Sequence, residues 1–316
     1  MLIRTLLIPL LALLASCSWR PADHNLPLPS EQAIVPLRAE RPLVALVLGS
    51  GGARGFAHIG VIKALEDAGI HADIVTGASS GAIVAALYAS GRSGRELEEI
   101  ALGLQEGDLV DVTVFGSGWV LGEALQEFVN RMVDGRPIEG LARPFAAVAT
   151  EARTGRMVVF NRGNTGLAVR ASASVPRVFV PPVINGEEYI DGGISSPVPV
   201  KIARAMGADI VIAVDVSWFA QSREQGEFAR YGRSGRYALL TEELEGADVV
   251  IVPRTVRTRM LDFTQKAANI AAGEVAGREA VLRVRESIAR AAASKPLRAA
   301  LPLAREERAT RPRPVQ

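Results

Sequence analysis

The residues Gly77–Gly81, with the sequence Gly-Ala-Ser-Ser-Gly, constrain the fold of this chain more than any other feature. A short strand-like segment, Ile74–Thr76, precedes them, and an apolar helix-like segment, Ala82–Leu87, follows. Glycines two positions either side of a serine fit a sharp strand-to-helix turn, because larger side chains would clash there. Such a turn lifts the serine hydroxyl above the edge of a sheet and aims a helix N-terminus at the same point. The alternative is a glycine-rich turn in which Ser79 only caps the helix.

Strand-like and helix-like segments alternate along the chain. Leu43–Leu48 is a short apolar run of the kind found in buried parallel strands, and a glycine-rich turn and a helix to about Ala68 follow it. Further strands are expected at residues 145–150, 156–160, 210–216 and 249–252, and a long amphipathic helix at 262–292. We therefore predict a three-layer α/β/α domain with a mostly parallel central sheet. With 316 residues, of which 48% are hydrophobic, the chain is long enough to bury such a core.

The positions of the histidines restrict which base could activate Ser79. The chain has three, His24, His58 and His71, and none of them follows Ser79. The order of serine, acidic residue and histidine found in α/β-hydrolases is therefore excluded. His58 lies one turn into the helix after the glycine-rich loop, where helix capping or packing would explain it equally well. Two choices remain from the residues alone: His58, or a carboxylate that acts directly.

The loop Gly49–Gly55 (Gly-Ser-Gly-Gly-Ala-Arg-Gly) follows the first strand. It does not match the dinucleotide pattern G-x-G-x-x-G, because Arg54 stands at the last glycine position, and no G-K-[ST] follows for a phosphate-binding loop. Backbone N–H groups with no Cβ in the way would suit an oxyanion hole. A tight strand-to-helix connection is the alternative.

Four segments occur here in one characteristic order: Gly51–Gly55, Gly77–Gly81, Ala171–Pro176 and Asp191–Gly193. In these motifs the chain resembles the patatin-like phospholipase family over about residues 43–217. The chain departs from the family's pattern in two places. It has a serine at position 50, where many members have glycine, and a glycine at position 193, where alanine is common. Neither change removes a catalytic group.

The resemblance implies a metal-independent serine acyl-ester hydrolase, similar to phospholipase A or lysophospholipase, that acts on membrane lipids or related acyl esters. It assigns Ser79 as nucleophile and Asp191 as base in a dyad, which makes His58 structural. The implied oxyanion-hole donors are the backbone N–H groups of Gly51, Gly52 and Ala53. The residues expected to support these motifs are Arg54, Gly55, Gly77, Gly81, Gly192 and Gly193. Arg54 would orient its loop or meet a lipid phosphate, or else form a structural ion pair.

The dyad does not determine the leaving group or the acceptor of the acyl chain. A transacylase, a thioesterase or a peptidase on the same dyad is therefore an alternative, and so is a non-catalytic lipid-binding scaffold, although the dyad and the loop are intact. No cofactor is expected, because the lone Cys17 cannot belong to a cysteine cluster and no metal-ligand pattern is present. The formal net charge of +2 indicates no nucleic-acid partner.

Residues 1–17 read as a secretory signal peptide, since Arg4 precedes an apolar run that is shorter than the ~20 residues of a membrane-spanning helix. The run ends in Leu-Ala-Ser-Cys, which resembles a bacterial lipobox. This resemblance implies lipidation of Cys17 and anchoring to the bacterial cell envelope. Ser18, where aspartate often signals inner-membrane retention, favours the periplasmic face of the outer membrane. An ordinary signal peptide with a chance cysteine is the alternative.

The rest of the chain divides by composition. Residues 18–42 are proline-rich and predict a semi-extended tether, 43–295 a patatin-like catalytic domain, and 296–316 a frayed tail. Within the domain, Leu109–Leu121 is apolar and is broken by Gly-Ser-Gly. It is expected to be either a lid or chain-binding wall, or simply a packed loop.

Overall fold

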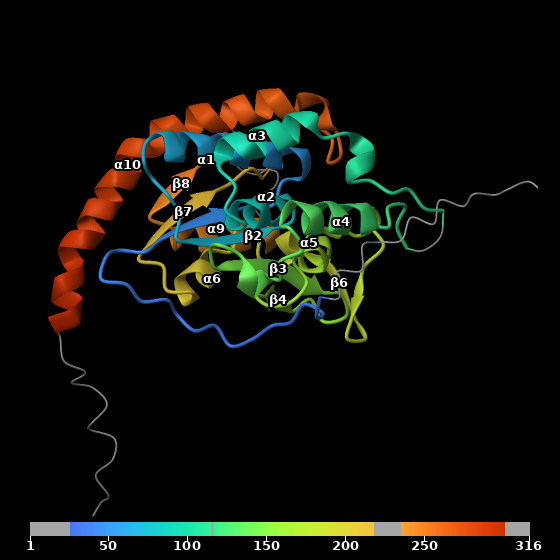
Figure 1. Ribbon diagram of the computed structural model, residues 1–316, viewed down its shortest axis with the longest axis horizontal. Coiled ribbons are helices and arrows are strands. Elements are labelled where there is room, and N and C mark those ends of the chain that lie inside the picture. Colours follow the sequence, from blue (N-terminus) through green and yellow to red (C-terminus); the bar gives the residue numbers. More distant parts are fainter. Residues whose placement is uncertain (1–25, 115–116, 218–234, 301–316) are drawn as a thin grey trace, which may run out of the picture.

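The computed structural model describes residues 26–114, 117–217 and 235–300 (Figure 1). In these residues an eight-stranded sheet carries helices on both faces. The strands are β1 (Val44–Leu48), β2 (Ile74–Ala78), β3 (Phe145–Glu151), β4 (Met157–Phe160), β5 (Val183–Ile184), β6 (Glu187–Asp191), β7 (Ile210–Val214) and β8 (Val249–Ile251). The α-helices are α1 (Phe56–Asp67), α2 (Ser80–Ala89), α3 (Gly94–Gly103), α4 (Glu123–Met132), α5 (Thr165–Ala173), α6 (Val200–Ala205), α9 (Gly235–Glu245) and α10 (Lys266–Ala300).

The centre of the sheet is parallel. Strands β3, β2, β1, β7 and β8 lie side by side in that order and pair in parallel. β4 and β6 both pair antiparallel with β3, and β5 pairs antiparallel with β6. The carboxyl ends of the parallel strands meet at one edge, where ligands usually bind in open α/β sheets. The predicted three-layer α/β/α fold with a mostly parallel sheet is confirmed.

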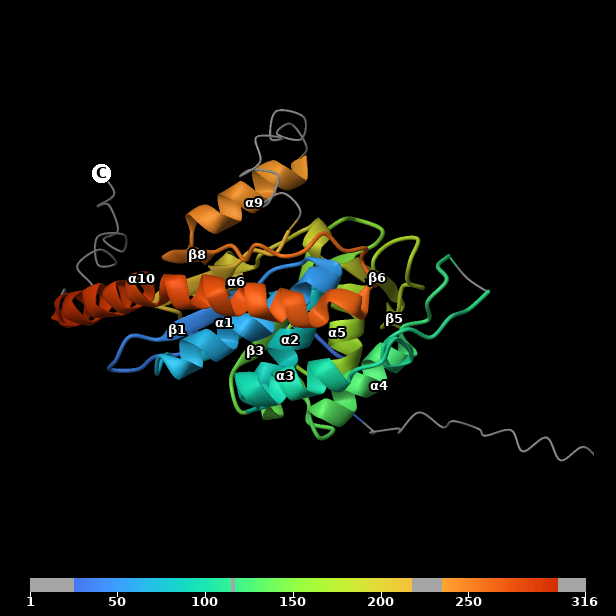
Figure 2. The ribbon, with the colours of Figure 1, turned by 90° about the horizontal axis from the view of Figure 1, so that it is seen from above.

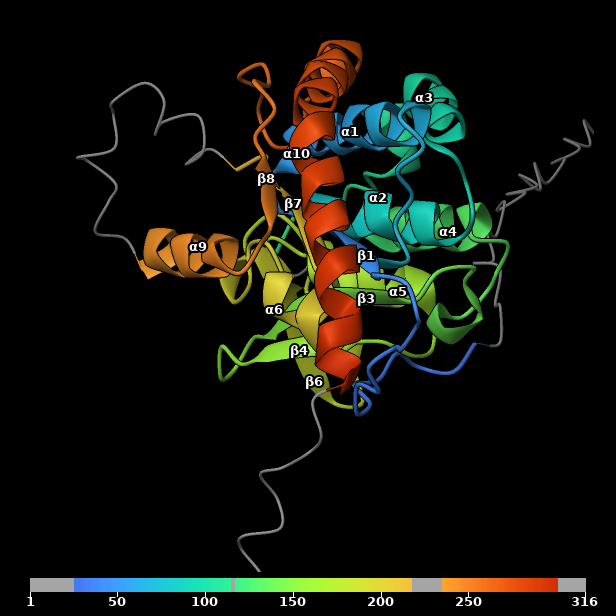
Figure 3. The ribbon, with the colours of Figure 1, turned by 90° about the vertical axis from the view of Figure 1, so that its left-hand side faces the viewer.

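Two hydrophobic clusters fill the space between the sheet and its helices. The larger cluster includes residues of α1, α2, α3, α5 and α10, whereas the smaller one includes residues of α6 and α9 on the other face. In Figures 2 and 3, α9 and α3 lie on opposite sides of the view, with strands of the sheet between them. All five residues of β1 are buried, because a central strand is covered on both faces.

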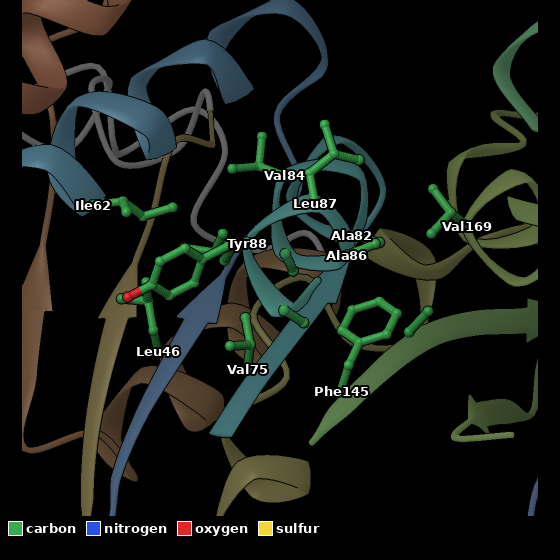
Figure 4. Packing of buried hydrophobic residues seen from close by; sticks show 14 of the residues in the cluster. Leu46, Ile62, Val75, Ala82, Val84, Ala86, Leu87, Tyr88, Phe145 and Val169 are labelled. Carbon is green, nitrogen blue, oxygen red and sulfur yellow. The ribbon is translucent and has the colours of Figure 1, made fainter. Parts of the chain in front are cut away.

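Helix α2, which follows the sharp turn, is buried along most of its length. Figure 4 shows its Tyr88 beside Leu46 and Ile62, with Val75 of β2 below the helix. Val84 and Leu87 lie on its outer side in the same view. An apolar helix buried on all sides sits rigidly on the sheet, so the residue at its N-terminus is held firmly in place.

Helices α1 and α10 run side by side and approach one another at glycines (Figure 1). A Cβ atom built on Gly60 would lie 1.9 Å from the carbonyl oxygen of Ile270. A Cβ atom on Gly273 would lie 1.9 Å from the carbonyl oxygen of Ala57. The two backbones are therefore in direct contact, with no side chain between them at these points.

The segment that precedes β1 lies along the domain. The N–H of Ser30 donates to the carbonyl of Arg162 at 3.1 Å, and that of Leu37 donates to Met206 at 2.9 Å. Farther along, Arg41 pairs with Asp73. The described part of the predicted tether, residues 26–42, therefore has no regular secondary structure but is fastened to the surface. The signal peptide, Cys17 and the rest of residues 1–25 lie outside the described residues.

The long C-terminal helix extends beyond its expected end at Ala292 and reaches Ala300. The first five residues of the predicted tail, 296–316, therefore belong to this helix. Residues 301–316 lie outside the described ranges. Across residues 26–114, 117–217 and 235–300, no helix combines the length and the apolar character needed to cross a bilayer.

Candidate active site

Ser79 occupies the turn between β2 and α2 in a backbone conformation that is rare for a residue with a side chain. Its φ is 56° and its ψ is −128°. A Cβ atom on Gly77 would lie 2.6 Å from the carbonyl oxygen of Gly81, and a Cβ atom on Gly81 would lie 2.0 Å from that of Leu48. Both glycines are thus required by close backbone contacts, as the sharp turn predicted. The strain at Ser79 is of the kind found at functional sites.

Asp191 ends strand β6 and faces Ser79. The Ser79 hydroxyl donates to the Asp191 carboxylate, with Oγ and Oδ2 2.5 Å apart. The other carboxylate oxygen accepts the N–H of Gly193 at 2.7 Å. Both side chains are buried. The structure therefore brings together the two residues that the resemblance paired, although 112 positions separate them in the chain.

Two serines that were not singled out individually hold this pair in place. Ser172 Oγ accepts the N–H of Ser79 at 3.0 Å and donates to the carbonyl of Val148 at 2.5 Å. The carbonyl of Ser174 accepts the N–H of Asp191 at 2.9 Å. The signal that could have identified them was their place in Ala171–Pro176, one of the four segments that carry the family resemblance.

The turn after Asp191 is closely packed. A Cβ atom on Gly192 would lie 1.9 Å from the carbonyl oxygen of Val148. A Cβ atom on Gly193 would lie 2.6 Å from Ser50 Oγ. The two departures from the family pattern are therefore complementary, because the Ser50 hydroxyl takes up the space that an alanine methyl at position 193 would need.

The glycine-rich loop leaves two of the three expected oxyanion donors available. Gly52 has a φ of +58°, and a Cβ atom on Gly51 would lie 2.5 Å from a methyl carbon of Val216. In the described part of the chain, the N–H groups of Gly51 and Gly52 have no hydrogen-bond partner. The assignment of Ala53 was wrong, because its N–H already donates to the carbonyl of Met260 at 2.8 Å.

Arg54 binds to the chain just after β7. Its Nε donates to the carbonyl of Val216 at 2.8 Å. Burial lowers the pKa of the Arg54 guanidinium, and the charge of Asp215 opposes this shift. Arg54 thus orients the glycine-rich loop, and it also borders the polar cavity described below.

His58 is fully buried and hydrogen-bonds to the loop, not to Ser79. Its Nε2 lies 2.8 Å from the carbonyl oxygen of Gly49, so Nε2 carries the hydrogen and donates. Burial lowers the pKa of His58 to about 4, since the interior disfavours the imidazolium. His58 is therefore neutral near pH 7, with Nε2 committed to the loop. This geometry favours a structural role over the alternative of a general base.

Two cavities meet at Ser79. The first, of about 110 Å³, is lined almost wholly by apolar side chains, including those of Ile83, Leu97 and Phe128. The second, of about 410 Å³, is more polar and includes Asp191 and Arg54. An apolar cavity on one side of a nucleophile and a polar cavity on the other fit an acyl chain joined to a polar leaving group.

The segment predicted as a lid or a packed loop borders the apolar cavity. Leu109 and Val110 line that cavity. Farther along, Val112 pairs with Val120 in an antiparallel bridge, while Val112 and Val114 are 71% and 88% exposed. Residues 115 and 116 lie outside the described residues. The base of the segment is thus a wall of the cavity, and its movement as a lid stays a prediction.

No group of three or more histidine, cysteine, aspartate or glutamate side chains that could hold a metal ion occurs in residues 26–114, 117–217 and 235–300. A hydrogen-bonded serine and carboxylate at the N-terminus of a helix are elements of nucleophilic acyl transfer.

Known proteins resemble this chain over part of its length. An uncharacterized NTE family protein of Mycobacterium tuberculosis is 37% identical over 193 residues, which cover 60% of this chain and 53% of that protein. Patatin-like phospholipase domain-containing protein 6 of Homo sapiens is 36% identical over 222 residues, which cover 66% of this chain and 16% of that protein. The chain thus spans about half the length of the first relative and far less of the second.

Among solved structures, VipD from Legionella pneumophila has a similar fold, with a TM-score of 0.53 and 14% sequence identity over 83% of this chain and 71% of that chain. The family model described as patatin-like phospholipase matches residues 46–204, which include the glycine-rich loop, the turn at Ser79 and Asp191. The chain belongs to the patatin-like phospholipase family.

Proposed function

We propose that this protein is a metal-independent serine hydrolase of lipid acyl esters, with Ser79 as nucleophile and Asp191 as base. The observation that carries the proposal is the 2.5 Å hydrogen bond between Ser79 and Asp191 at the meeting point of an apolar and a polar cavity. A phospholipase A or lysophospholipase reaction is the form that best suits this pair of cavities.

In the first step, Asp191 accepts the hydroxyl proton while Ser79 Oγ attacks the ester carbonyl carbon. The negative charge that develops on the carbonyl oxygen is stabilised by the N–H groups of Gly51 and Gly52. Losing one donor of this kind typically costs ~2.7–4 kcal/mol of barrier. The intermediate collapses, the alcohol leaves with the proton from Asp191, and the acyl group stays on Ser79.

In the second step, water replaces the alcohol. Asp191 takes a proton from the water, the resulting hydroxide attacks the acyl carbon, and the proton returns to Ser79 Oγ as the fatty acid leaves. The polar cavity on the Asp191 side provides the space from which this water approaches.

The apolar cavity is assigned to the acyl chain, and enlarging a buried side chain of its wall tests this assignment. Ala101 of α3 lines the cavity and is buried, so Ala101→Leu is expected to reduce its volume. We expect the kcat/KM ratio of dodecanoyl to butanoyl esters to fall at least about tenfold, since one methylene in such a pocket is worth about 1–3 kcal/mol. The exposed neighbour Leu102 serves as the control, because Leu102→Ala should leave the ratio unchanged. An unaltered ratio in Ala101→Leu would assign the acyl chain elsewhere.

The reaction itself is tested with the wild-type protein in EDTA and a panel of p-nitrophenyl esters, phospholipids, lysophospholipids, neutral glycerides and acyl thioesters. We expect release of fatty acid from long-chain esters with EDTA present. Preferential thioester cleavage would identify a thioesterase, and acyl transfer to an added alcohol without net acid release would identify a transacylase. Inactivity on every substrate would favour a non-catalytic scaffold.

We also propose that Cys17 carries a lipid anchor that holds the protein on the bacterial outer membrane, facing the periplasm. Leu14–Cys17 supports this through its resemblance to a lipobox. Cells expressing the protein should incorporate labelled palmitate into it, and Cys17→Ala should lose the label entirely. Equal labelling of the two forms would rule out the anchor, and membrane fractionation of the labelled protein would separate outer from inner membrane.

A further inference from the structure

A buried carboxylate outside the dyad lies behind the turn that follows Asp191. Glu243 belongs to α9 and is 4% exposed. Its Oε2 accepts the N–H of Val198 at 2.8 Å, and its Oε1 accepts the hydroxyl of Ser196. A carboxylate that is buried against hydrogen-bond donors from one short segment must be explained, because taking its charge out of water is costly.

The charges around Glu243 do not account for its burial. Lys201 of α6 exerts an electrostatic effect on it, but the Lys201 ammonium pairs with the neighbouring Glu242, at 2.5 Å. Glu242 opposes ionisation of Glu243. Burial, the largest influence, raises the pKa of Glu243 to about 7. The hydrogen bonds from Ser196 and Val198 are therefore the main interactions that offset the cost of burying this carboxylate.

The segment that Glu243 holds touches several parts of the candidate site. At its start, the N–H of Ser196 donates to the carbonyl of Gly192 at 2.8 Å, next to the Gly193 amide that binds Asp191. In its middle, the carbonyl of Pro197 accepts the N–H of Ser50 at 2.9 Å, and Ser50 immediately precedes the oxyanion donors. One short segment thus fixes both the base and the glycine-rich loop.

Helix α9 also faces the substrate space, since its Leu240 lines the polar cavity. We propose that Glu243 is a positioning residue that clamps the segment Ser196–Val198 to α9 and thereby sets the relative placement of Asp191 and the oxyanion loop. Glu243 touches none of the reacting atoms and acts through its two hydrogen bonds. This inference rests on the proposed hydrolase function and adds a residue to it.

Substitutions of Glu243 differ in whether they can keep its two hydrogen bonds. Glutamine at position 243 can accept from the Val198 N–H through Oε1 and donate to Ser196 Oγ through Nε2, so it preserves both contacts without the charge. Aspartate keeps the charge but is one methylene shorter, so it cannot keep both contacts. Geometry and charge are therefore separated by Glu243→Gln and Glu243→Asp.

The experiment measures kcat and KM for a soluble p-nitrophenyl ester, and the rate at which a fluorophosphonate labels Ser79. We expect Glu243→Asp and Glu243→Ala to lower kcat and the labelling rate about 10- to 100-fold with little change in KM, as a displaced catalytic group would. Glu243→Gln should stay within about threefold of wild type. The matched control is Glu242→Gln, which removes the exposed neighbour and should have no effect.

Thermal unfolding at two pH values adds a readout that is independent of activity. Folding raises the pKa of Glu243 from its ordinary value of 4.5 to about 7, so the protonated side chain stabilises the folded state. Wild type should therefore lose stability as the pH rises from about 4.5 to about 7. Glutamine at position 243 does not ionise, so the Glu243→Gln variant does not lose stability in this way. The Tm of the variant minus that of wild type should therefore be larger at pH 8 than at pH 5. An equal difference at both values would overturn the buried-carboxylate interpretation.

Three outcomes oppose the proposal differently. If Glu243→Asp and Glu243→Ala are folded and keep wild-type kcat, the clamp does not position the site. If Glu243→Gln is as impaired as Glu243→Asp, the charge matters and the hydrogen-bond geometry does not. If wild type neither cleaves esters nor is labelled at Ser79, the hydrolase function fails first.

Should Glu243→Ala not fold, Ser196→Ala, which removes only one of the two contacts, is expected to give a smaller fall in kcat of about three- to tenfold.

Discussion

Ser79→Ala is expected to abolish ester hydrolysis, and Asp191→Asn is expected to lower kcat by about four orders of magnitude or more. Without Oγ there is no nucleophile, and an asparagine amide cannot take the proton that the carboxylate accepts across 2.5 Å. The two losses should not add in the double variant, because the two groups act as a unit. The measurement is kcat/KM on the best ester of the panel, with folding checked by circular dichroism.

The control for this pair is a carboxylate that lies at the surface. Asp67 forms an exposed ion pair with Arg95 at 2.8 Å, so Asp67→Asn should keep wild-type activity. The opposite assignment of the base is also testable, because His58→Asn should cost stability more than chemistry. Full activity in Asp191→Asn, together with inactivity in folded His58→Asn, would show that the base is the histidine.

Gly60→Ala and Gly273→Ala are expected to destabilise the protein by about 3 kcal/mol or more each, which corresponds to a fall in Tm of roughly 10 °C. Each added methyl would lie 1.9 Å from a backbone carbonyl oxygen of the facing helix. Neither backbone can yield locally, so α1 and α10 must separate. Differential scanning calorimetry on the two variants measures the effect.

The matched control is Gly103→Ala in α3, where a Cβ atom meets nothing within 4 Å. There the same substitution should be neutral or stabilise by up to about 1 kcal/mol, because alanine restricts the unfolded chain. Activity should fall in Gly60→Ala even below its Tm, since α1 carries the histidine that binds the glycine-rich loop. A Tm within 2 °C of wild type for both glycine variants would mean that the helices are not in backbone contact.

The features that could be predicted from sequence are those that a short stretch determines by itself. The turn at Ser79 needs only Gly77 and Gly81 close by, and β1 needs only five consecutive apolar residues. The alternation of such elements was enough to predict the layers. The short strand β6 was not predicted, because Glu187 and Glu188 interrupt the apolar pattern that indicates a buried strand. Pairing with β3, which the local sequence does not reveal, stabilises it.

Other parts of the site could not be predicted, because distant residues decide them. The sequence of the loop does not distinguish the N–H of Ala53 from that of Gly52, whereas in the structure the Ala53 N–H donates to the carbonyl of Met260. Nothing near Glu243 in the sequence indicates that it binds a segment some 45 positions earlier. The pairing of Ser79 with Asp191 came from family resemblance, since no local pattern links them.

The contact between Ala53 and Met260 has a consequence for how the protein is made. Arg54 binds the carbonyl of Val216, and the next residue back, Ala53, binds that of Met260, so the C-terminal third of the chain holds the loop near the N-terminus. Contacts of such long range form late, because the intervening chain must first be ordered. We expect a nascent chain that carries both Ser79 and Asp191 to lack a formed oxyanion hole until residue 260 has been synthesised and folded. A chain built this way completes the loop beside Ser79 only after most of its length has been made.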